Sequence, residues 1–299
     1  MVKDSHCVSL IIPTIERATL EQCLVALRQQ TRPPDEIIVL KDPTRRGAAW
    51  ARNEGIRQAH GDLIAFIDDD CIPPPDWLER LISAIDKYGA AGAGGPLRET
   101  DRLLFHIRQR YPSSTEEQID TAGFAGNGAN IIYRRSWIET LAQQDGFMFN
   151  EAFKQLGSED WEFVWRLRHC GGTMTFVPVP VQHLRRETPQ SFLRRQFTRG
   201  KGIAFFFKIQ RRAHSQIAPH QSLVWGDHQA APRAHWLAAL WQKAIGPFDS
   251  HNFPSLRDFW LFWLGEKLQG LGFVWGLLTL QVPEHCIPNS VRAYRGNKP

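Results

Sequence analysis

The sequence predicts an α/β fold in which a mostly parallel sheet is flanked by helices and followed by a helical C-terminal extension. Through the first hundred residues, apolar runs of strand length alternate with segments of helical period, the pattern of a parallel sheet covered on both faces. The polar residues that interrupt this pattern come directly after the apolar runs. Open α/β sheets bind ligands at those strand ends. The sequence therefore places a site at the carboxyl edge of the sheet.

The strands are expected where short apolar runs meet turn residues. Residues 8–12 form a continuous apolar run closed by Pro13, and residues 63–67 form another that leads directly into Asp68. Continuous apolar runs of this length suit strands that are buried on both faces. The same reasoning predicts further strands at 36–40, 131–133 and 173–178.

The helices are expected where apolar residues recur every three or four positions. Leu20, Leu24 and Leu27 share one face of the segment 19–30, which predicts an amphipathic helix. Further helices are predicted at 48–59, 77–88 and 161–169. Residues 97–151 are less regular and include a glycine-rich stretch, GFAGNGAN, from Gly123.

The C-terminal part has a different composition. Residues 213–232 are polar and expected to loop, whereas residues 256–280 are rich in Trp, Phe and Leu. The apolar segment has the length of a membrane span, but it carries Arg257, Asp258, Glu266 and Lys267, which a span rarely tolerates. An amphipathic helix lying in the plane of a membrane suits its Trp260, Trp263 and Trp275. The alternative is a pair of helices packed on the catalytic domain, or a homodimer contact.

Charge and cysteine content narrow the class of protein. The formal net charge of +5 is too small to indicate nucleic acid; it fits either a solvated surface or attraction to phosphates and anionic lipid headgroups. The five cysteines are scattered, with no C-x-x-C pair, which argues against a disulfide framework and favours a reducing compartment. The N-terminal apolar run is too short for a signal peptide, so we expect a cytoplasmic protein.

The strongest local signal is the run of Asp68, Asp69 and Asp70 after a buried strand. Crowded carboxylates are unfavourable unless a cation or hydrogen bonds offset their charge. Oxygen ligands suit Mg²⁺ or Mn²⁺, so a divalent metal site is the preferred interpretation. The alternative is an acidic turn that caps the next helix, but Asp76 already fits that role before Trp77.

Three other groups of residues are open to more than one interpretation. Glu159 and Asp160 begin a helix, where a carboxylate is either a general base or a favourable charge at the helix dipole. His183 follows a strand and is either a ligand or a structural histidine. Several basic residues could clamp a diphosphate or simply be solvated: Arg45, Arg46, Arg52, Arg185, Arg186, Arg194, Arg195, Arg199 and Lys201.

Taken together, these segments resemble family-2 glycosyltransferases over roughly residues 7–205. The resemblance rests on the order and spacing of VSLIIPT, DEIIVLKD, the stretch from RRGAAWARNEG to FIDDDCIPPPDW, GNGANIIYRRSW, SEDWEFVWRLRHCGG and FVPVPVQH. It implies a GT-A-like (Rossmann-like) nucleotide-sugar-binding catalytic domain at 1–210. The helical, aromatic-rich region at 211–299 would then associate with a membrane or form a dimer.

The resemblance also assigns residues to roles. It implies Asp160 as the catalytic base, Asp70 and His183 at an Mn²⁺ or Mg²⁺ ion, and Pro13, Thr14, Glu16, Asp42, Arg52, Asn53, Asp68 and Asp69 around the donor nucleotide. We expect Asn130, Glu159, Arg195 and Arg199 on the acceptor or phosphate side.

The implied reaction is a single displacement that inverts the anomeric carbon. The metal offsets the charge of the departing nucleoside diphosphate, while Asp160 takes the proton of the acceptor hydroxyl. The implied donor is a UDP-, GDP- or dTDP-type nucleotide sugar. The implied acceptor is a saccharide or a lipid-linked sugar at the inner face of the cell membrane, and no nucleic acid is expected.

The chain also departs from the family pattern. Lys41-Asp42 stands where many members have two acidic residues, and Pro43-Thr44-Arg45-Arg46 stands where they often have Gly-Ser-x-Asp, so the base of the donor stays open. The Q-x-x-R-W motif of processive members is matched only in part by RQFTRG, which favours transfer of one sugar. The competing hypotheses are a non-catalytic binding or scaffold protein on the same fold and a nucleotidyltransferase. The latter is disfavoured because the loop after the first strand, PTIERATLEQ, lacks glycine.

Overall fold

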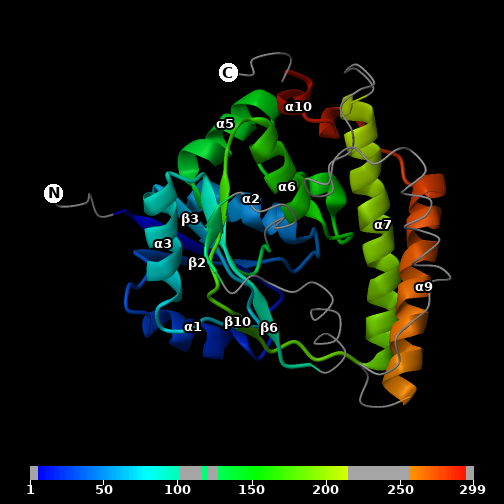
Figure 1. Ribbon diagram of the computed structural model, residues 1–299, viewed down its shortest axis with the longest axis horizontal. Helices are drawn as coiled ribbons and strands as arrows, with labels where there is room; N and C mark the ends of the chain where they lie inside the picture. The colour runs from blue at the N-terminus through cyan, green and yellow to red at the C-terminus, as the bar shows by residue number, and fades with distance from the viewer. Residues whose placement is uncertain (1–5, 102–115, 120–126, 215–255, 294–299) are drawn as a thin grey trace.

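The computed structural model describes residues 6–101, 116–119, 127–214 and 256–293. A central seven-stranded sheet has the order β2-β1-β3-β8-β5-β9-β7, and a three-stranded sheet has the order β4-β10-β6. Helices cover the large sheet on both faces, and two long helices stand side by side at one end of the molecule (Figure 1). The predicted α/β class with a helical C-terminal extension is confirmed.

The predicted strands all form, with small changes at their ends. The large sheet contains β1 (Val8–Thr14), β2 (Glu36–Lys41), β3 (Leu63–Phe66), β5 (Gly92–Gly94), β7 (Gln118–Ile119), β8 (Ile131–Arg134) and β9 (Met174–Phe176). The small sheet contains β4 (Cys71–Ile72), β6 (Leu97–Glu99) and β10 (Val181–His183). The strands of the small sheet are two or three residues long, too short to show a hydrophobic period in the sequence.

The predicted helices also form. They are α1 (Leu20–Arg28), α2 (Ala48–Gln58), α3 (Trp77–Tyr88) and α6 (Glu159–His169), and the aromatic-rich C-terminal segment forms α9 (Leu256–Thr279). The structure adds elements that were not predicted individually: α5 (Arg135–Asp145), α7 (Pro189–His214), α10 (Asn289–Ala293) and the 3₁₀ turns η1 (Glu151–Phe153) and η3 (Glu284–Cys286). Two other sequence features lie largely outside the described residues. They are the part of the predicted loop 213–232 that begins at residue 215, and residues 123–126 of the glycine-rich stretch.

Parallel pairing is concentrated in the N-terminal half of the sheet. Strand β1 pairs in parallel with both β2 and β3, as the alternation of strands and helices predicts. Strand β8 runs antiparallel to both of its neighbours, β3 and β5. The sheet is therefore mixed beyond β3, because β8 is reached by a connection that reverses the chain.

The core lies in two layers, one on each face of the sheet. One layer packs the apolar sides of α1 and α3, including Cys23, Leu27 and Trp77, on the sheet. The other packs α2, α5 and α6 on the opposite face, with Phe66, Phe149 and Phe163 at its centre. Because described helices cover both faces, a ligand is expected at an edge of the sheet.

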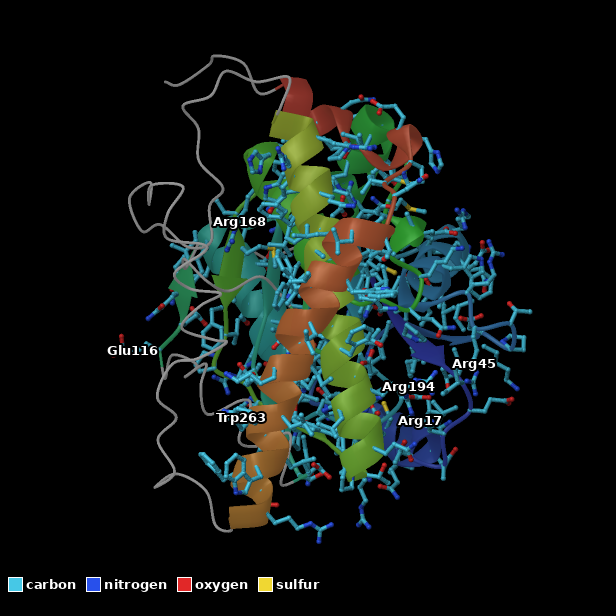
Figure 2. The ribbon with its side chains drawn as sticks, turned by 90° about the vertical axis from the view of Figure 1, so that its right-hand side faces the viewer. Arg17, Arg45, Glu116, Arg168, Arg194 and Trp263 are labelled. Carbon is cyan, nitrogen blue, oxygen red and sulfur yellow. The ribbon has the colours of Figure 1, made fainter. Side chains whose placement is uncertain are left out.

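Helices α7 and α9 run parallel to each other and pack through glycines. A Cβ added to Gly200 would collide with the carbonyl oxygen of Gln269, and one added to Gly272 would collide with the carbonyl oxygen of Phe197. The backbones can approach this closely only where a side chain is absent. Figure 1 shows the two helices side by side, and in Figure 2 α9 crosses in front of α7.

The helix pair is joined to the catalytic part by a shared apolar cluster. Phe205, Phe206 and Ile209 of α7 pack with Phe153 and Val282. The predicted boundary at residue 210 lies inside α7. The division at 1–210 and 211–299 stays a prediction.

We expect Gly272→Ala to lower the free energy of unfolding by about 1–3 kcal/mol, the usual cost of overpacking a close contact. Gly270 of the same helix provides the matched control, because a Cβ there meets nothing within 4 Å. Gly270→Ala should be neutral or stabilise by up to about 1 kcal/mol through helix propensity. Urea denaturation of both variants checks this; equal stabilities would contradict the close packing.

Candidate active site

Three side chains meet across the small sheet. In its register, His183 of β10 lies opposite Cys71 of β4 on one side and opposite Glu99 of β6 on the other. Residues that lie opposite each other in a sheet project from the same face. The small sheet thus aligns a thiol, an imidazole and a carboxylate, and it places Asp70, the residue before β4, beside them.

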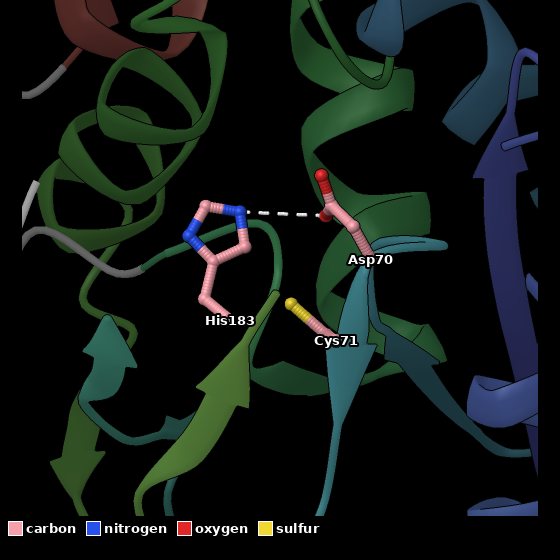
Figure 3. A group of neighbouring side chains, drawn as sticks. All are labelled: Asp70, Cys71 and His183. Carbon is pink, nitrogen blue, oxygen red and sulfur yellow. Dashed lines mark ion pairs between the residues drawn. The ribbon is translucent and has the colours of Figure 1, made fainter. Parts of the chain in front are cut away.

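Asp70 and His183 face each other at this point (Figure 3). The Nε2 atom of His183 lies 3.4 Å from Oδ1 of Asp70. Burial by itself would raise the pKa of Asp70, but the neighbouring His183 and Arg17 hold it below its ordinary value. Burial would lower the pKa of His183, and the two carboxylates of Asp70 and Glu99 instead raise it to about 9.

The residues present fit a divalent cation. The two carboxylate oxygens of Asp70 are buried, and neither accepts a hydrogen bond from the part of the chain that the structure describes. Donor atoms of Asp70, Cys71 and His183 lie within 4.8 Å of one another. Burial raises the pKa of the Cys71 thiol well above its ordinary value, so a hard cation is better served by Asp70 and His183, the two predicted ligands.

Asp68 has different surroundings from Asp70. Its side chain is 38% exposed, and its Oδ1 lies 4.0 Å from Nη2 of Arg52. Arg52, on α2, donates from Nη1 to Glu159 at 2.6 Å, and both side chains of that pair are buried. Asp68 is therefore the one carboxylate of the Asp68–Asp70 run that faces solvent at the strand edge.

Asp69 is occupied inside the protein. It is fully buried and accepts a hydrogen bond from Thr14 Oγ1 at 2.5 Å, while Arg17 pairs with its other oxygen. Thr14 Oγ1 in turn accepts from the backbone N–H of Glu16 at 2.7 Å. This geometry favours a role for Asp69 in holding the loop after β1 over direct contact with a donor.

Asp160 is partly buried at the first turn of α6. Its carboxylate accepts hydrogen bonds from the backbone N–H of Gly128 at 3.1 Å and of Trp161 at 2.9 Å. Burial and the negative charge of Glu159 raise the pKa of Asp160 to about 6. A carboxylate with such a pKa is a better proton acceptor than an ordinary aspartate.

Several predicted site residues form hydrogen bonds with other groups of the protein. Asp42 accepts from the backbone N–H of Arg46 and of Gly47. Asn53 bonds the segment 149–151 through both ends of its amide. Asn130 accepts from Trp77 Nε1 and donates to two carbonyl oxygens. These contacts explain why the residues are polar and buried; their predicted contacts with substrate stay predictions.

The remaining predicted residues lie near the surface. Pro13 is half-buried within β1, and Glu16 is exposed and pairs with Lys41 at 2.6 Å. The guanidinium of Arg199 lies 5.8 Å from the centre of the Trp161 ring. Arg195 pairs with the buried carboxylate of Glu187, and burial together with neighbouring Arg185 lowers the pKa of Arg195 to about 10.

Sequence reasoning did not single out Arg17, Glu99 or Glu187. Arg17 neutralises Asp69 and lies 3.5 Å from Asp70, and Glu187 accepts from both Arg185 and Arg195. Arg17 follows the end of β1 by three residues, so its place in the sequence already puts a positive charge at the edge of the sheet where the aspartates lie. Nothing in the sequence pairs Glu99 with His183, because that contact depends on the register of two three-residue strands.

Comparison with known proteins identifies the family and agrees with the fold. Residues 40–142 match the model of a family described as Glycosyl transferase family 2. A mannosyltransferase from Pyrobaculum calidifontis, solved in complex with GDP-Man and Mn²⁺, superposes with a TM-score of 0.57 at 15% identity, covering 90% of this chain and 87% of that one. This likeness shows the fold alone.

Curated relatives extend the match over more of the chain. Glycosyltransferase AglE of Haloferax volcanii is 26% identical over 235 residues, which cover 68% of this chain and 75% of the relative. Succinoglycan biosynthesis protein ExoM of Rhizobium meliloti is 30% identical over 169 residues, which cover 53% of this chain and 51% of the relative. The chain thus spans between half and three quarters of the length of these relatives.

We expect Asp160→Asn to be more stable than wild type at neutral pH. The native state holds the Asp160 proton more tightly than the unfolded chain, because the pKa is raised from 3.8 to about 6. Wild type therefore loses stability as pH rises through about 6, by on the order of 1–3 kcal/mol, and the variant does not. Melting temperatures between pH 4 and 8, a window of about two units on either side of that pKa, measure the difference.

Glu36→Gln is the control, because the pKa of Glu36 is lowered in the folded protein whereas that of Asp160 is raised. Burial opposes ionisation of Glu36, but hydrogen bonds from Ser9 and His60 lower its pKa to about 2. Its contribution to stability is fully present above the unfolded pKa and is lost only as pH falls toward the folded value. This variant should be less stable than wild type at neutral pH. A destabilised Asp160→Asn at pH 8 would contradict the raised pKa.

Proposed function

The chain carries a family-2 glycosyl transferase domain, and from this premise we propose that it transfers a sugar from a nucleoside diphosphate sugar to an acceptor hydroxyl with the help of Mn²⁺ or Mg²⁺. The observation that carries the proposal is the pair of Asp70 and His183 at the carboxyl edge of the sheet. The buried oxygens of Asp70 accept no hydrogen bond among the described residues. Their cationic neighbours His183 and Arg17 stand 3.4 and 3.5 Å away, and a bound cation would supply the missing close partner. The solved mannosyltransferase with Mn²⁺ supports a divalent metal.

Each residue of the site has a chemical task in this proposal. Asp70 and His183 would hold the cation, which when bound supplies positive charge against the leaving diphosphate. Asp68, the exposed carboxylate of the run, faces the donor, and Arg52 keeps it oriented at 4.0 Å. Asp69 acts through Thr14 and Arg17 by fixing the loop after β1.

Asp160 is the proposed base. Its raised pKa of about 6 leaves it ionised at neutral pH yet basic enough to take a proton from the acceptor hydroxyl. The hydroxyl oxygen then attacks the anomeric carbon as the bond to the diphosphate breaks, which inverts the configuration in one displacement. Glu159 is unsuited to this task, because it is buried and paired with Arg52.

The acceptor side is proposed to lie toward the start of α7. Arg185 and Arg195 share the single carboxylate of Glu187, so one positive charge of this group is not offset by that carboxylate. A guanidinium pair near Asp70 suits a phosphate, whether of the donor or of a lipid-linked acceptor. The relationship to a succinoglycan biosynthesis protein supports an acceptor in polysaccharide or glycolipid synthesis.

We further propose that the outer face of α9 lies on a membrane surface. Trp260, Leu264, Leu271, Trp275 and Leu278 are exposed, and their spacing of three, four or seven residues places them on one side of the helix. Figure 2 shows this helix on the outside of the molecule, with Trp263 labelled. Contiguous apolar surface of this kind marks an interaction site.

The charges on this face favour an anionic lipid surface as the occupant. Lys267 falls within the apolar stripe and Arg257 at its N-terminal end, whereas Asp258 is buried on the other side. The Nζ of Lys267 lies 5.1 Å from the ring centre of Trp263, as amphipathic side chains arrange themselves at an interface. Among the described helices, none combines the length and the apolarity that crossing a bilayer requires. The five free cysteines support the cytoplasmic side.

A nucleotide panel tests the donor site. We expect one of UDP, GDP, dTDP or CDP to raise the melting temperature of wild type in the presence of Mn²⁺, because ligands that bind the native state stabilise it by mass action. The shift should be absent without metal and absent in Asp70→Ala. A stable wild-type protein that shows no shift with any nucleotide would contradict the proposal.

Asp160→Asn is the matched variant for this panel. It should keep the metal-dependent shift, because Asp160 is not a proposed ligand, and it should lose sugar transfer by on the order of 10²- to 10⁴-fold. Equal transfer by wild type and Asp160→Asn would exclude Asp160 as the base. Binding without transfer in both proteins, across a range of acceptors, would favour the non-catalytic scaffold.

Flotation with vesicles tests the membrane surface. Wild type should float with phosphatidylcholine vesicles that contain phosphatidylglycerol and much less with phosphatidylcholine alone, since basic residues attract anionic headgroups. Leu271→Glu with Leu278→Glu should reduce the floating fraction several-fold. The control is Val25→Glu, an exposed apolar position on α1. If instead the α9 variant converts a dimer to a monomer and wild type does not float, α9 is a homodimer contact.

A further inference from the structure

We infer that Glu99 is a positioning residue that orients the imidazole of His183 so that its Nε2 atom is presented to a cation bound by Asp70. The inference rests on the proposed function, because it presupposes that Asp70 and His183 hold the metal. It adds a residue that is neither a ligand nor in contact with substrate.

The backbone geometry brings Glu99 to His183 and keeps it there. Strands β6 and β10 run in parallel with His183 opposite Glu99. The carbonyl oxygen of His183 also accepts hydrogen bonds from the backbone N–H and from the hydroxyl of Thr100, at 3.1 and 2.8 Å. On the other side, the N–H of Leu184 donates to the carbonyl oxygen of Asp70 at 2.7 Å. The backbones of all three residues are thus tied together.

The two ring nitrogens of His183 lie at different distances from their carboxylate neighbours. The Nδ1 atom of His183 donates to Oε2 of Glu99 at 2.6 Å, a short charge-assisted hydrogen bond. The Nε2 atom lies 3.4 Å from Asp70, beyond the usual length of an N–H···O bond. The ring is therefore fixed by Glu99 and only loosely associated with Asp70.

This arrangement decides which nitrogen can become a ligand. An imidazole binds a metal through a nitrogen that has lost its proton, while the other nitrogen keeps its own. With Nδ1–H held by Glu99, the nitrogen left for a cation is Nε2, which faces Asp70. Histidine ligands commonly donate their second N–H to a carboxylate, which fixes the ring and makes the ligand more basic.

A purely structural explanation leaves part of the geometry unexplained. If Glu99 served only to neutralise a buried histidine, Asp70 could do the same, and a second buried carboxylate would add a burial cost. Glu99 is 8% exposed and Asp70 is 2% exposed, so two carboxylates are buried around one imidazole. Because Asp70 accompanies the imidazole at 3.4 Å, neutralising the imidazole does not by itself require Glu99.

The test compares Glu99→Ala and Glu99→Gln with wild type by calorimetric titration of Mn²⁺. Removing such a partner typically weakens metal binding by about 10- to 100-fold, and this is the loss expected for Glu99→Ala. The Mn²⁺ affinity of Glu99→Gln should lie between those of wild type and Glu99→Ala, because the amide oxygen of glutamine can still accept the hydrogen bond from Nδ1 of His183. Electron–nuclear double resonance on ¹⁵N-histidine-labelled protein should show imidazole coupling to Mn²⁺ in wild type and Glu99→Gln, and a weakened coupling in Glu99→Ala.

Glu36→Gln is the matched control, since Glu36 also pairs with a histidine, His60, at 3.3 Å but lies at the opposite end of β2 from the site. It should bind Mn²⁺ as wild type does. Wild-type affinity and coupling in both Glu99 variants would overturn the inference while leaving the metal site intact. If Glu99→Ala does not fold, wild-type affinity in Glu99→Gln overturns it. If wild type binds no Mn²⁺, or Asp70→Asn binds it equally well, the proposed metal site fails and the inference fails with it.

Discussion

The repulsion among three successive carboxylates at the end of β3 is the constraint on which the rest of the site depends. Each carboxylate is accommodated differently. Asp69 is neutralised by Arg17 and accepts a hydrogen bond from Thr14 inside the protein, and Asp68 keeps contact with solvent near Arg52. Asp70 has partial countercharges in His183 and Arg17, at 3.4 and 3.5 Å, and its oxygens lack a hydrogen bond from the described residues. Neighbouring carboxylates can remain ionised together only when cations or hydrogen bonds offset them, so the surrounding loops are arranged to supply these partners.

The same principle extends outward from the run of aspartates. Arg52 reaches Asp68 because its own burial on α2 is offset by Glu159, and Glu159 adds to the raised pKa of Asp160. The donor side and the proposed base are therefore electrostatically linked through one buried arginine.

Most strands and helices of the sheet could be predicted because each element carries its own period. The resemblance implies Asp70 and His183 as metal ligands; the structure places them 3.4 Å apart, and their role as ligands stays a prediction. The resemblance implies Asn53 beside the donor and Asn130 on the acceptor side. The structure shows that both bond the protein's own backbone, which explains their burial, and their contacts with substrate stay predictions. The pairing of Glu99 with His183 could not be predicted. It arises from the register of two strands of three residues each, and strands this short show no alternation of apolar and polar residues from which they could be predicted.

Helix α7 connects the chemistry to the surface that we propose for the membrane. It begins two residues after Glu187, which binds Arg195, and its 26 residues correspond to about 39 Å at 1.5 Å per residue. Along this length it packs closely on α9 through Gly200 and Gly272. A glycine-mediated contact without intervening side chains leaves little freedom for the helices to slide. The apolar face of α9 is thus held at a fixed position relative to the arginines beside Asp70, so that a membrane bound on that face would present its headgroups to the site at a defined distance.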